Sequence, residues 1–193
     1  MALSYCNIQV ELREISLRDR PQSLYDISKK GTVPVILTKD NIVIDESLNI
    51  MIWALNKKND QTWLNTDNKE MDLINLNDTE FKQWLDKYKY YDRYPENSKE
   101  SYRDECDSIL KKYEIKLIKS QYLINNHLSI ADIAIFPFIR QFANVDYKWF
   151  ENHYIHLNKW MKSIASSSLF ISIMNKYNTW DEKREPEIIN FNQ

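Results

Sequence analysis

Residues 31–53 read GTVPVILTKDNIVIDESLNIMIW. Two apolar, β-branched runs, at 35–38 and 42–44, flank a Lys-Asp-Asn turn, so the sequence predicts two short strands joined by a tight hairpin. Ser47 follows the second strand and suits a helix N-cap, because apolar side chains recur after it at helical spacing. The stretch therefore predicts a loop, a hairpin and a capped helix in close succession.

Three features of this stretch suit a small peptide ligand. A helix start has free backbone N–H groups, and with the Ser47 hydroxyl it can hold a carboxylate. Glu46 beside it can take an ammonium group, and Val33, held extended by Pro34, can offer its backbone as a strand edge. Together they would bind a peptide with a free amine and a free carboxylate. The alternative interpretation is a plain hairpin followed by a capped helix.

Composition narrows the class of protein. The chain has 193 residues and 23.3 kDa, enough for one or two small domains, and 43% hydrophobic with 28% charged residues is typical of a globular protein. A net charge of −2 and a pI near 6.0 offer no electrostatic attraction for nucleic acid or an anionic membrane. The sequence shows neither an apolar run that could span a bilayer nor a signal-peptide pattern, so we expect a cytoplasmic protein.

Residue counts exclude further classes of site. Gly31 is the only glycine, whereas phosphate-cradling loops need several glycines in register, so nucleotide-driven functions are not expected. The two cysteines, Cys6 and Cys106, form neither a Cys-x-x-Cys pair nor a zinc spacing, and we expect free thiols. The histidines offer no third ligand, so no metal site is predicted.

The chain divides by its pattern into two domains. Residues 1–58 mix signals in the order strand, helix, strand, strand, helix, with an alternating strand over 8–15. Residues 59–77 are polar and are predicted to be a linker. Residues 78–193 are predicted to be helical apart from an extended tail over 181–193. The helices of this second half are expected to begin near Asp78, Ser98, Ser129, Tyr154 and Leu169.

One helix start in the second half is well marked. Ser129 and Asp132 stand three residues apart, which is a capping box with Asp in place of the usual Glu. The residues that follow are nearly all apolar, so this helix is predicted to be buried on most sides, and Pro137 inside it requires a local kink.

An α/β half joined to an all-helical half, with Val33-Pro34 and Glu46-Ser47 at this spacing, resembles the glutathione transferase family. The Ser129 capping box is similar to that in the family's long core helix. Arg20-Pro21, thirteen positions before Val33-Pro34, is similar to the omega-like, cysteine-type members. The resemblance implies a thioredoxin-like N-terminal domain, incomplete at its N-terminus, and an all-α C-terminal domain.

The resemblance also implies roles at a glutathione site. The Val33 backbone would pair with the cysteinyl part, and Pro34 would be cis. Glu46 would bind the γ-glutamyl ammonium and Ser47 the γ-glutamyl carboxylate. Arg20 would reach the glycyl carboxylate, unless it is a solvated turn charge. The residues assigned to glutathione are Arg20, Thr32, Val33, Pro34, Glu46 and Ser47.

A second substrate would lie against the first helix of the second domain. Trp84, Tyr88 and Tyr91 form one helical stripe, and Arg93 follows near its end. Tyr88, Tyr91 and Arg93 are the pocket candidates, because a phenol tolerates a wet cleft. The alternative interpretation is that these side chains belong to the core or to a dimer contact. The resemblance to the family also implies a homodimer.

The N-terminus departs from the family. Family members begin with a strand and then a helix that carries a catalytic Cys, Ser or Tyr at its start, whereas residues 1–6 resemble the end of that helix. The resemblance therefore does not include the family's first strand and catalytic motif, for which this sequence shows no counterpart. Either Met1 is an internal methionine, or the strand at 8–15 finds another partner. Cys6 is only a weak nucleophile candidate, because a helix C-terminus disfavours a thiolate.

Two hypotheses of function follow, with a third behind them. The first is a glutathione S-transferase that performs thiol transfer or conjugates glutathione to small electrophiles, with glutathione as co-substrate. The second is a catalytically inactive binding or regulatory module of the same fold. The third is a nonfunctional product of a truncated gene.

Overall fold

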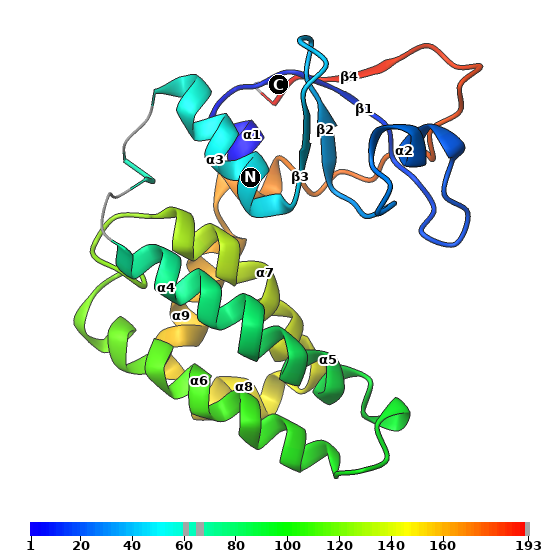
Figure 1. Cartoon of the computed structure of the whole chain (residues 1–193). Helices are drawn as coiled ribbons and strands as arrows, with labels where there is room; N and C mark the ends of the chain where they lie inside the picture. Colours follow the sequence, from blue (N-terminus) through cyan, green and yellow to red (C-terminus); the bar gives the residue numbers. More distant parts are fainter. Residues whose placement is uncertain (60–61, 65–67, 192–193) are drawn as a thin grey trace. The chain divides into compact units, whose positions relative to one another are not determined.

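The computed structural model describes residues 1–59, 62–64 and 68–191, and the chain forms two compact units (Figure 1). Unit 1 combines Met1–Asp60 with Ser168–Gln193, and unit 2 is Gln61–Ser167. The C-terminal segment therefore groups with the N-terminal half, although the sequence placed it in the helical domain.

Unit 1 has the predicted order of strand, helix, strand, strand and helix, with shorter strands than expected. Its elements are α1 (Ala2–Tyr5), β1 (Val10–Leu12), α2 (Gln22–Ile27), β2 (Val35–Leu37), β3 (Val43–Asp45), α3 (Ser47–Lys58), α10 (Ser168–Ile171) and β4 (Glu187–Ile189). Its core includes Leu24, Ile50 and Leu55, which α2 and α3 contribute.

The predicted hairpin is confirmed. β2 and β3 pair antiparallel, with Val35 opposite Asp45 and Leu37 opposite Val43. The Thr38 N–H donates to the Ile42 carbonyl at 2.9 Å and closes the turn. Because the strands run antiparallel, the residue before β2 and the residue after β3 lie at the same, open end of the hairpin.

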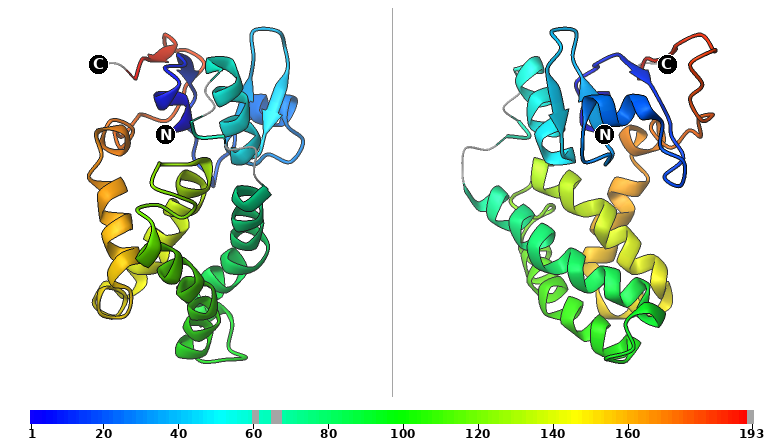
Figure 2. Two further views of the ribbon diagram at one scale, coloured as in Figure 1. Left: turned by 90° about the vertical axis from the view of Figure 1, so that its left-hand side faces the viewer. Right: turned by 45° about the vertical axis from the view of Figure 1, so that its right-hand side comes forward.

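β1 has a partner that the sequence did not predict. It pairs antiparallel with β4, with Val10 opposite Ile189 and Leu12 opposite Glu187 (Figures 1 and 2). The Arg13 guanidinium lies 4.9 Å from the centre of the Trp180 ring, in the segment that leads to β4. Part of the expected extended tail is therefore a strand, while residues 192–193 lie outside the described residues.

In the described part of unit 2 the regular elements are helices, joined by turns and loops. Its elements are α4 (Asn68–Leu76), the π-helix η1 (Asn77–Phe81), α5 (Lys82–Lys89), the 3₁₀-helix η2 (Tyr91–Arg93), α6 (Lys99–Lys119), α7 (Ile130–Val145), α8 (Tyr147–His153) and α9 (Ile155–Ala165). Figure 2 shows these helices packed alongside one another. Helix α8 was not expected, because its seven residues fall between two stronger patterns.

The segment predicted to be a linker contains helix α4. Residues 60, 61 and 65–67 of that segment lie outside the described residues, but α4 packs against α7. Leu73 and Ile74 are buried in this contact region, as is Trp63 just before the helix. The segment was predicted to be a linker because most of its residues are polar. Its few apolar side chains lie where α4 packs against the rest of unit 2.

The predicted capping box of α7 is confirmed. Ser129 is the N-cap, and Asp132 accepts a hydrogen bond from its N–H at 3.0 Å. Asp132 also accepts from the Leu123 N–H at 2.9 Å and from the Trp160 indole N–H at 2.8 Å, so it ties a loop and α9 to the start of α7. Burial raises the pKa of the Asp132 carboxyl, and these hydrogen bonds lower it in part.

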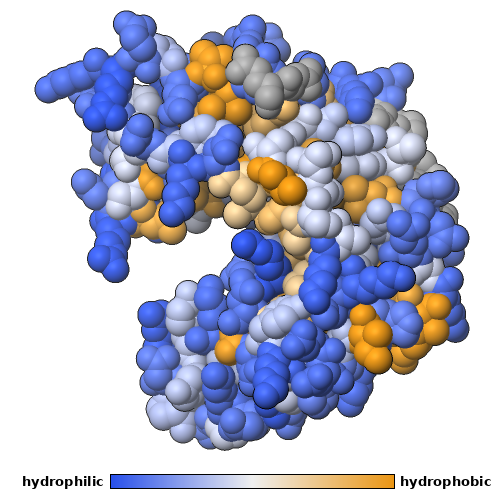
Figure 3. Space-filling model, turned by 180° about the vertical axis from the view of Figure 1, so that it is seen from behind, coloured by the Kyte–Doolittle hydropathy of each residue, from blue (hydrophilic) through white to orange (hydrophobic). Residues whose placement is uncertain are grey.

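The surface carries no large apolar face in the view of Figure 3, where hydrophilic side chains surround small hydrophobic patches. Within the part of the chain that the structure describes, every helix is too short or too polar to cross a membrane.

We predict that Asp132→Ala lowers the free energy of unfolding by about 3 kcal/mol, because four buried donors, the Leu123 and Ser129 N–H groups, the Ser129 hydroxyl and the Trp160 indole N–H, lose their acceptor together. Urea unfolding followed by circular dichroism would measure the change. The matched control is Asp104→Ala on exposed surface of α6, which should leave the urea midpoint nearly unchanged. A similar small shift in both variants would show that the Asp132 carboxylate does not hold unit 2 together.

Candidate functional site

The predicted peptide-binding residues meet at the open end of the β2–β3 hairpin. Thr32, Val33 and Pro34 directly precede β2, and Glu46 and Ser47 directly follow β3. The register of Val35 opposite Asp45 brings these two short segments side by side. All five residues are exposed, and the Val33–Pro34 peptide bond is cis, as the resemblance implied.

Glu46 has an unusual backbone. Its φ of 65° and ψ of 129° lie outside the regions that residues other than glycine favour, and such strain often accompanies a functional position. Glu46, not Ser47, is the N-cap of α3, and its carbonyl accepts from the Ile50 N–H at 3.1 Å. Ser47 is therefore the first helical residue. It lies in the first turn of α3, where the backbone N–H groups have no acceptor within the helix.

Lys30 joins the two acidic residues at this end of the hairpin. Its Nζ lies 2.8 Å from Asp45 Oδ2 and 3.2 Å from Glu46 Oε1. Hydrogen bonds to Asp45 and then Glu46 raise the pKa of Lys30, and the same contact lowers the pKa of Asp45. Sequence reasoning did not assign Lys30 to the site, although its place three residues before Val33 puts it at the same hairpin end as Glu46.

A tight turn carries Lys30 to this position. The Gly31 N–H donates to the Ser28 carbonyl at 2.9 Å, and Gly31 has a φ of +61°. The Tyr25 ring lies against Gly31 so closely that an added Cβ would meet the ring Cε1 at 2.4 Å. Both the backbone angle and the neighbouring ring therefore require glycine here.

Two other predicted residues of unit 1 come from segments outside the hairpin. Arg20 is exposed just before Pro21, the N-cap of α2, and forms no ion pair within the described part of the chain. Cys6 is buried at the C-cap of α1, the helix end that disfavours a thiolate. The other cysteine, Cys106, is buried in α6, where desolvation raises its pKa.

The predicted second-substrate residues all belong to unit 2. Tyr88 is only 2% exposed, and its ring centre lies 5.0 Å from that of Phe142, whereas the sequence placed it in a wet cleft. Desolvation raises the pKa of Tyr88 to about 12. Tyr91 and Arg93 are exposed in η2, beyond the helix face that Tyr88 buries. Helical spacing alone did not show that this face packs against α7.

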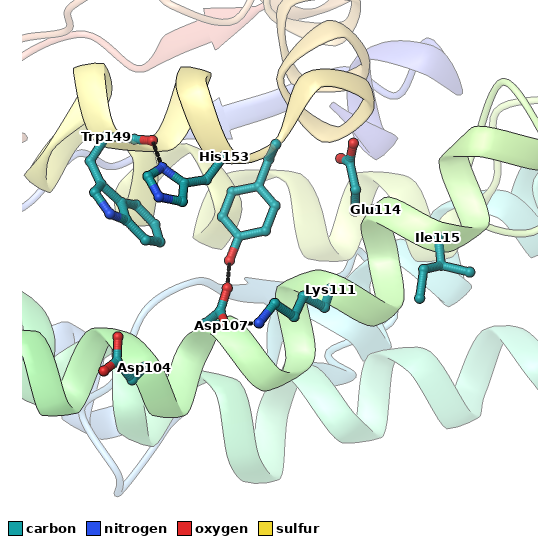
Figure 4. Close-up of a pocket in the computed structure, with 8 residues that line it drawn as sticks. Asp104, Asp107, Lys111, Glu114, Ile115, Trp149 and His153 are labelled. Atoms are coloured by element: carbon teal, nitrogen blue, oxygen red, sulfur yellow. Dashed lines mark hydrogen bonds and ion pairs between the residues drawn. The ribbon is translucent and has the colours of Figure 1, made fainter.

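Unit 2 also has a pocket of about 280 Å³ that no sequence argument predicted (Figure 4). Its acidic residues already have partners within the unit. Asp107 accepts from the Tyr154 hydroxyl and pairs with Lys111 at 2.6 Å, and Glu114 accepts from the Leu157 N–H at 2.7 Å. The lining residues are Asp104, Asp107, Lys111, Glu114, Ile115, Trp149, His153 and Tyr154. These contacts join α6 to α8 and α9. The polar side chains of the pocket therefore serve to hold the helices of unit 2 together.

Among the residues that the structure describes, no three or more His, Cys, Asp or Glu side chains are grouped to hold a metal ion.

Two family models match the chain. The model described as glutathione S-transferase, N-terminal domain, matches residues 1–57, and the model for the C-terminal domain of the same family matches residues 76–168. Together they cover most of the chain. The chain therefore belongs to the glutathione S-transferase family. No curated protein sequence gives a significant match.

Solved structures share the fold. The glutathione transferase URE2P6 from Phanerochaete chrysosporium, in complex with oxidized glutathione, has a TM-score of 0.76 at 15% identity, over 88% of this chain and 85% of that chain. BphK, a bacterial glutathione transferase, has a TM-score of 0.75 at 18% identity, over 89% and 88% of the two chains. A family member from Pseudomonas fluorescens with two glutathione bound has a TM-score of 0.75 at 15% identity, over 88% and 83%.

We predict that Gly31→Ala lowers the free energy of unfolding by about 1–2 kcal/mol, because alanine is strained at positive φ and its methyl group must displace the Tyr25 ring. Thermal unfolding would measure the change. In the double variant with Tyr25→Ala, only the backbone strain should remain. An unchanged melting temperature for Gly31→Ala would show that the turn tolerates a side chain.

Proposed function

We propose that the chain is a glutathione S-transferase that binds glutathione at the open end of the β2–β3 hairpin. The observation that carries this proposal is the strand register, which sets Val33 and Pro34 beside Glu46 and Ser47. The backbone before β2, a carboxylate and a helix start then lie at one end of the hairpin, and these are the groups that a tripeptide with a free amine and a free carboxylate requires. Membership of the family and the neighbours crystallised with glutathione support the choice of ligand.

Each part of the site suits one part of glutathione. The exposed Val33 backbone pairs with the cysteinyl residue as an added strand would. The Glu46 carboxylate accepts from the γ-glutamyl ammonium, and a charge-assisted hydrogen bond of this kind is stronger than a neutral one. The Ser47 hydroxyl and the first N–H groups of α3 hold the γ-glutamyl carboxylate at the positive end of the helix dipole. Thr32 lies beside Val33, and Arg20 serves the glycyl carboxylate.

The finer parts of the proposal concern the reaction and the assembly. The reaction is thiol transfer or conjugation of glutathione to a small electrophile, of the omega-like type. Tyr91 and Arg93 are the exposed candidates for the second substrate, and Tyr88 would support them from the core. We further propose a cytoplasmic homodimer, which sedimentation velocity and cell fractionation would test.

The alternative from the sequence is an inactive binding or regulatory module of the same fold. Cys6 and Cys106, the two cysteines of the chain, are both buried, and Cys6 lies at the unfavourable end of its helix. A module of this kind would bind glutathione without turnover. Assays with a mixed disulfide and with 1-chloro-2,4-dinitrobenzene separate the two functions, because only the enzyme gives product.

We predict that Glu46→Gln weakens glutathione binding at least about tenfold, because the γ-glutamyl ammonium loses its charged acceptor. Isothermal titration calorimetry would give the dissociation constants. The matched control is Asp40→Asn, which removes one carboxylate from the turn at the opposite end of the same hairpin and should leave the affinity unchanged. Equal affinities for the wild-type protein and Glu46→Gln would refute the site assignment.

We also predict that Cys6→Ala leaves both the glutathione affinity and any turnover unchanged, because this thiol is buried and lies at a helix C-terminus. Loss of turnover with retained folding and affinity would instead identify Cys6 as the nucleophile.

A further inference from the structure

The carboxylate proposed to take the ammonium group of glutathione already holds an ammonium group of the chain. Lys30 Nζ lies 3.2 Å from Glu46 Oε1 and 2.8 Å from Asp45 Oδ2. Glu46 accepts a hydrogen bond from Lys30 here, as it would from the ligand. The Glu46 carboxylate has a second oxygen, but both ammonium groups are cations, so a ligand ammonium bound at Glu46 repels Lys30 and the two groups compete for this carboxylate.

The arrangement contains two carboxylates and one lysine. Asp45 gives Lys30 a second partner, which is the closer one, so Lys30 can release Glu46 and stay bound to Asp45. Asp45 is held at this place by its pairing with Val35, and its carbonyl accepts from the Asn49 side chain at 3.1 Å. In the structure Lys30 contacts both carboxylates, and a second position, bound to Asp45 alone, would cost it one hydrogen bond.

The two positions suit two kinds of ligand. A ligand with an ammonium group takes Glu46 and moves Lys30 onto Asp45. A ligand with the same carboxylate but without the ammonium group leaves Lys30 on Glu46, where it neutralises a charge that would otherwise repel the ligand's carboxylate. The chain's own lysine thus replaces the missing group.

We infer that Lys30 is a specificity-determining residue of the glutathione site, and that it lets the site accept γ-glutamyl-type thiol peptides whose α-amino group is missing. This inference rests on the proposed function, because it requires the ligand to bind at Glu46. Asp45 takes part as the residue that receives Lys30 when an ammonium group is present.

The size of the effect follows from exposure. The side chains of Lys30, Asp45 and Glu46 are 57%, 34% and 62% exposed, so solvent and salt screen their charges. Exposed pairs of this kind change an equilibrium by at most about fivefold. The experiment must therefore compare the dissociation constants of two ligands for the same variant. A substitution that weakens the binding of both ligands equally leaves this ratio unchanged.

The experiment compares glutathione with glutaryl-cysteinyl-glycine, which keeps both carboxylates and the thiol but lacks the amine. Calorimetry gives both dissociation constants for the wild-type protein, Lys30→Met and Lys29→Met. Lys29 is an exposed neighbouring lysine with no ion pair in the described part of the chain, which makes it the matched control. We expect the preference for glutathione to rise about three- to fivefold in Lys30→Met and to stay unchanged in Lys29→Met.

Two outcomes overturn the inference, and Glu46→Gln separates them. An unchanged preference in Lys30→Met, when Glu46→Gln does weaken glutathione binding, removes the role of Lys30 and leaves the proposed site intact. Unchanged glutathione affinity in Glu46→Gln removes the proposed site and the inference with it. Lower salt should enlarge the effect in Lys30→Met, because screening weakens.

Discussion

The antiparallel pairing of Val35 with Asp45 sets the geometry on which the candidate site depends. A shift of one residue in this register would turn every side chain of the strand to the other face and would separate Val33 from Glu46. The turn at Thr38 to Ile42 closes the other end of the hairpin, so the two site segments cannot slide independently. A short hairpin of three-residue strands thereby holds a backbone edge, a carboxylate and a helix start together.

The same hairpin end concentrates charge. Asp45 and Glu46 are consecutive acids: Asp45 is the last residue of β3, and Glu46, which follows it, has a strained backbone. Lys30 balances them through a turn that only glycine permits at Gly31. Charge, strain and a glycine-dependent turn therefore coincide at one exposed place, which is unusual for surface that serves only to solvate the chain.

Local features of the chain were predictable because their causes are local. The hairpin, the start of α6 at its Ser98 cap and the Ser129 capping box each depend on residues within one or two turns. Helix α4 was missed because a polar composition outweighed the few apolar residues that it buries. The pairing of β1 with β4 was missed because it joins segments from opposite ends of the chain, which no local pattern records.

The sequence alone determined which chemical groups the site offers, since Val33, Glu46 and Ser47 and their order follow from the residues and the hairpin pattern. Tertiary structure decided which of the candidate side chains are exposed and unpaired, and so able to contact a ligand. Packing against α7 buried Tyr88, although helical spacing alone allowed it to face solvent. The turn at Gly31 brought Lys30 onto Glu46, sixteen residues away in the chain. Availability depends on contacts between distant residues, and such contacts form only when the chain folds.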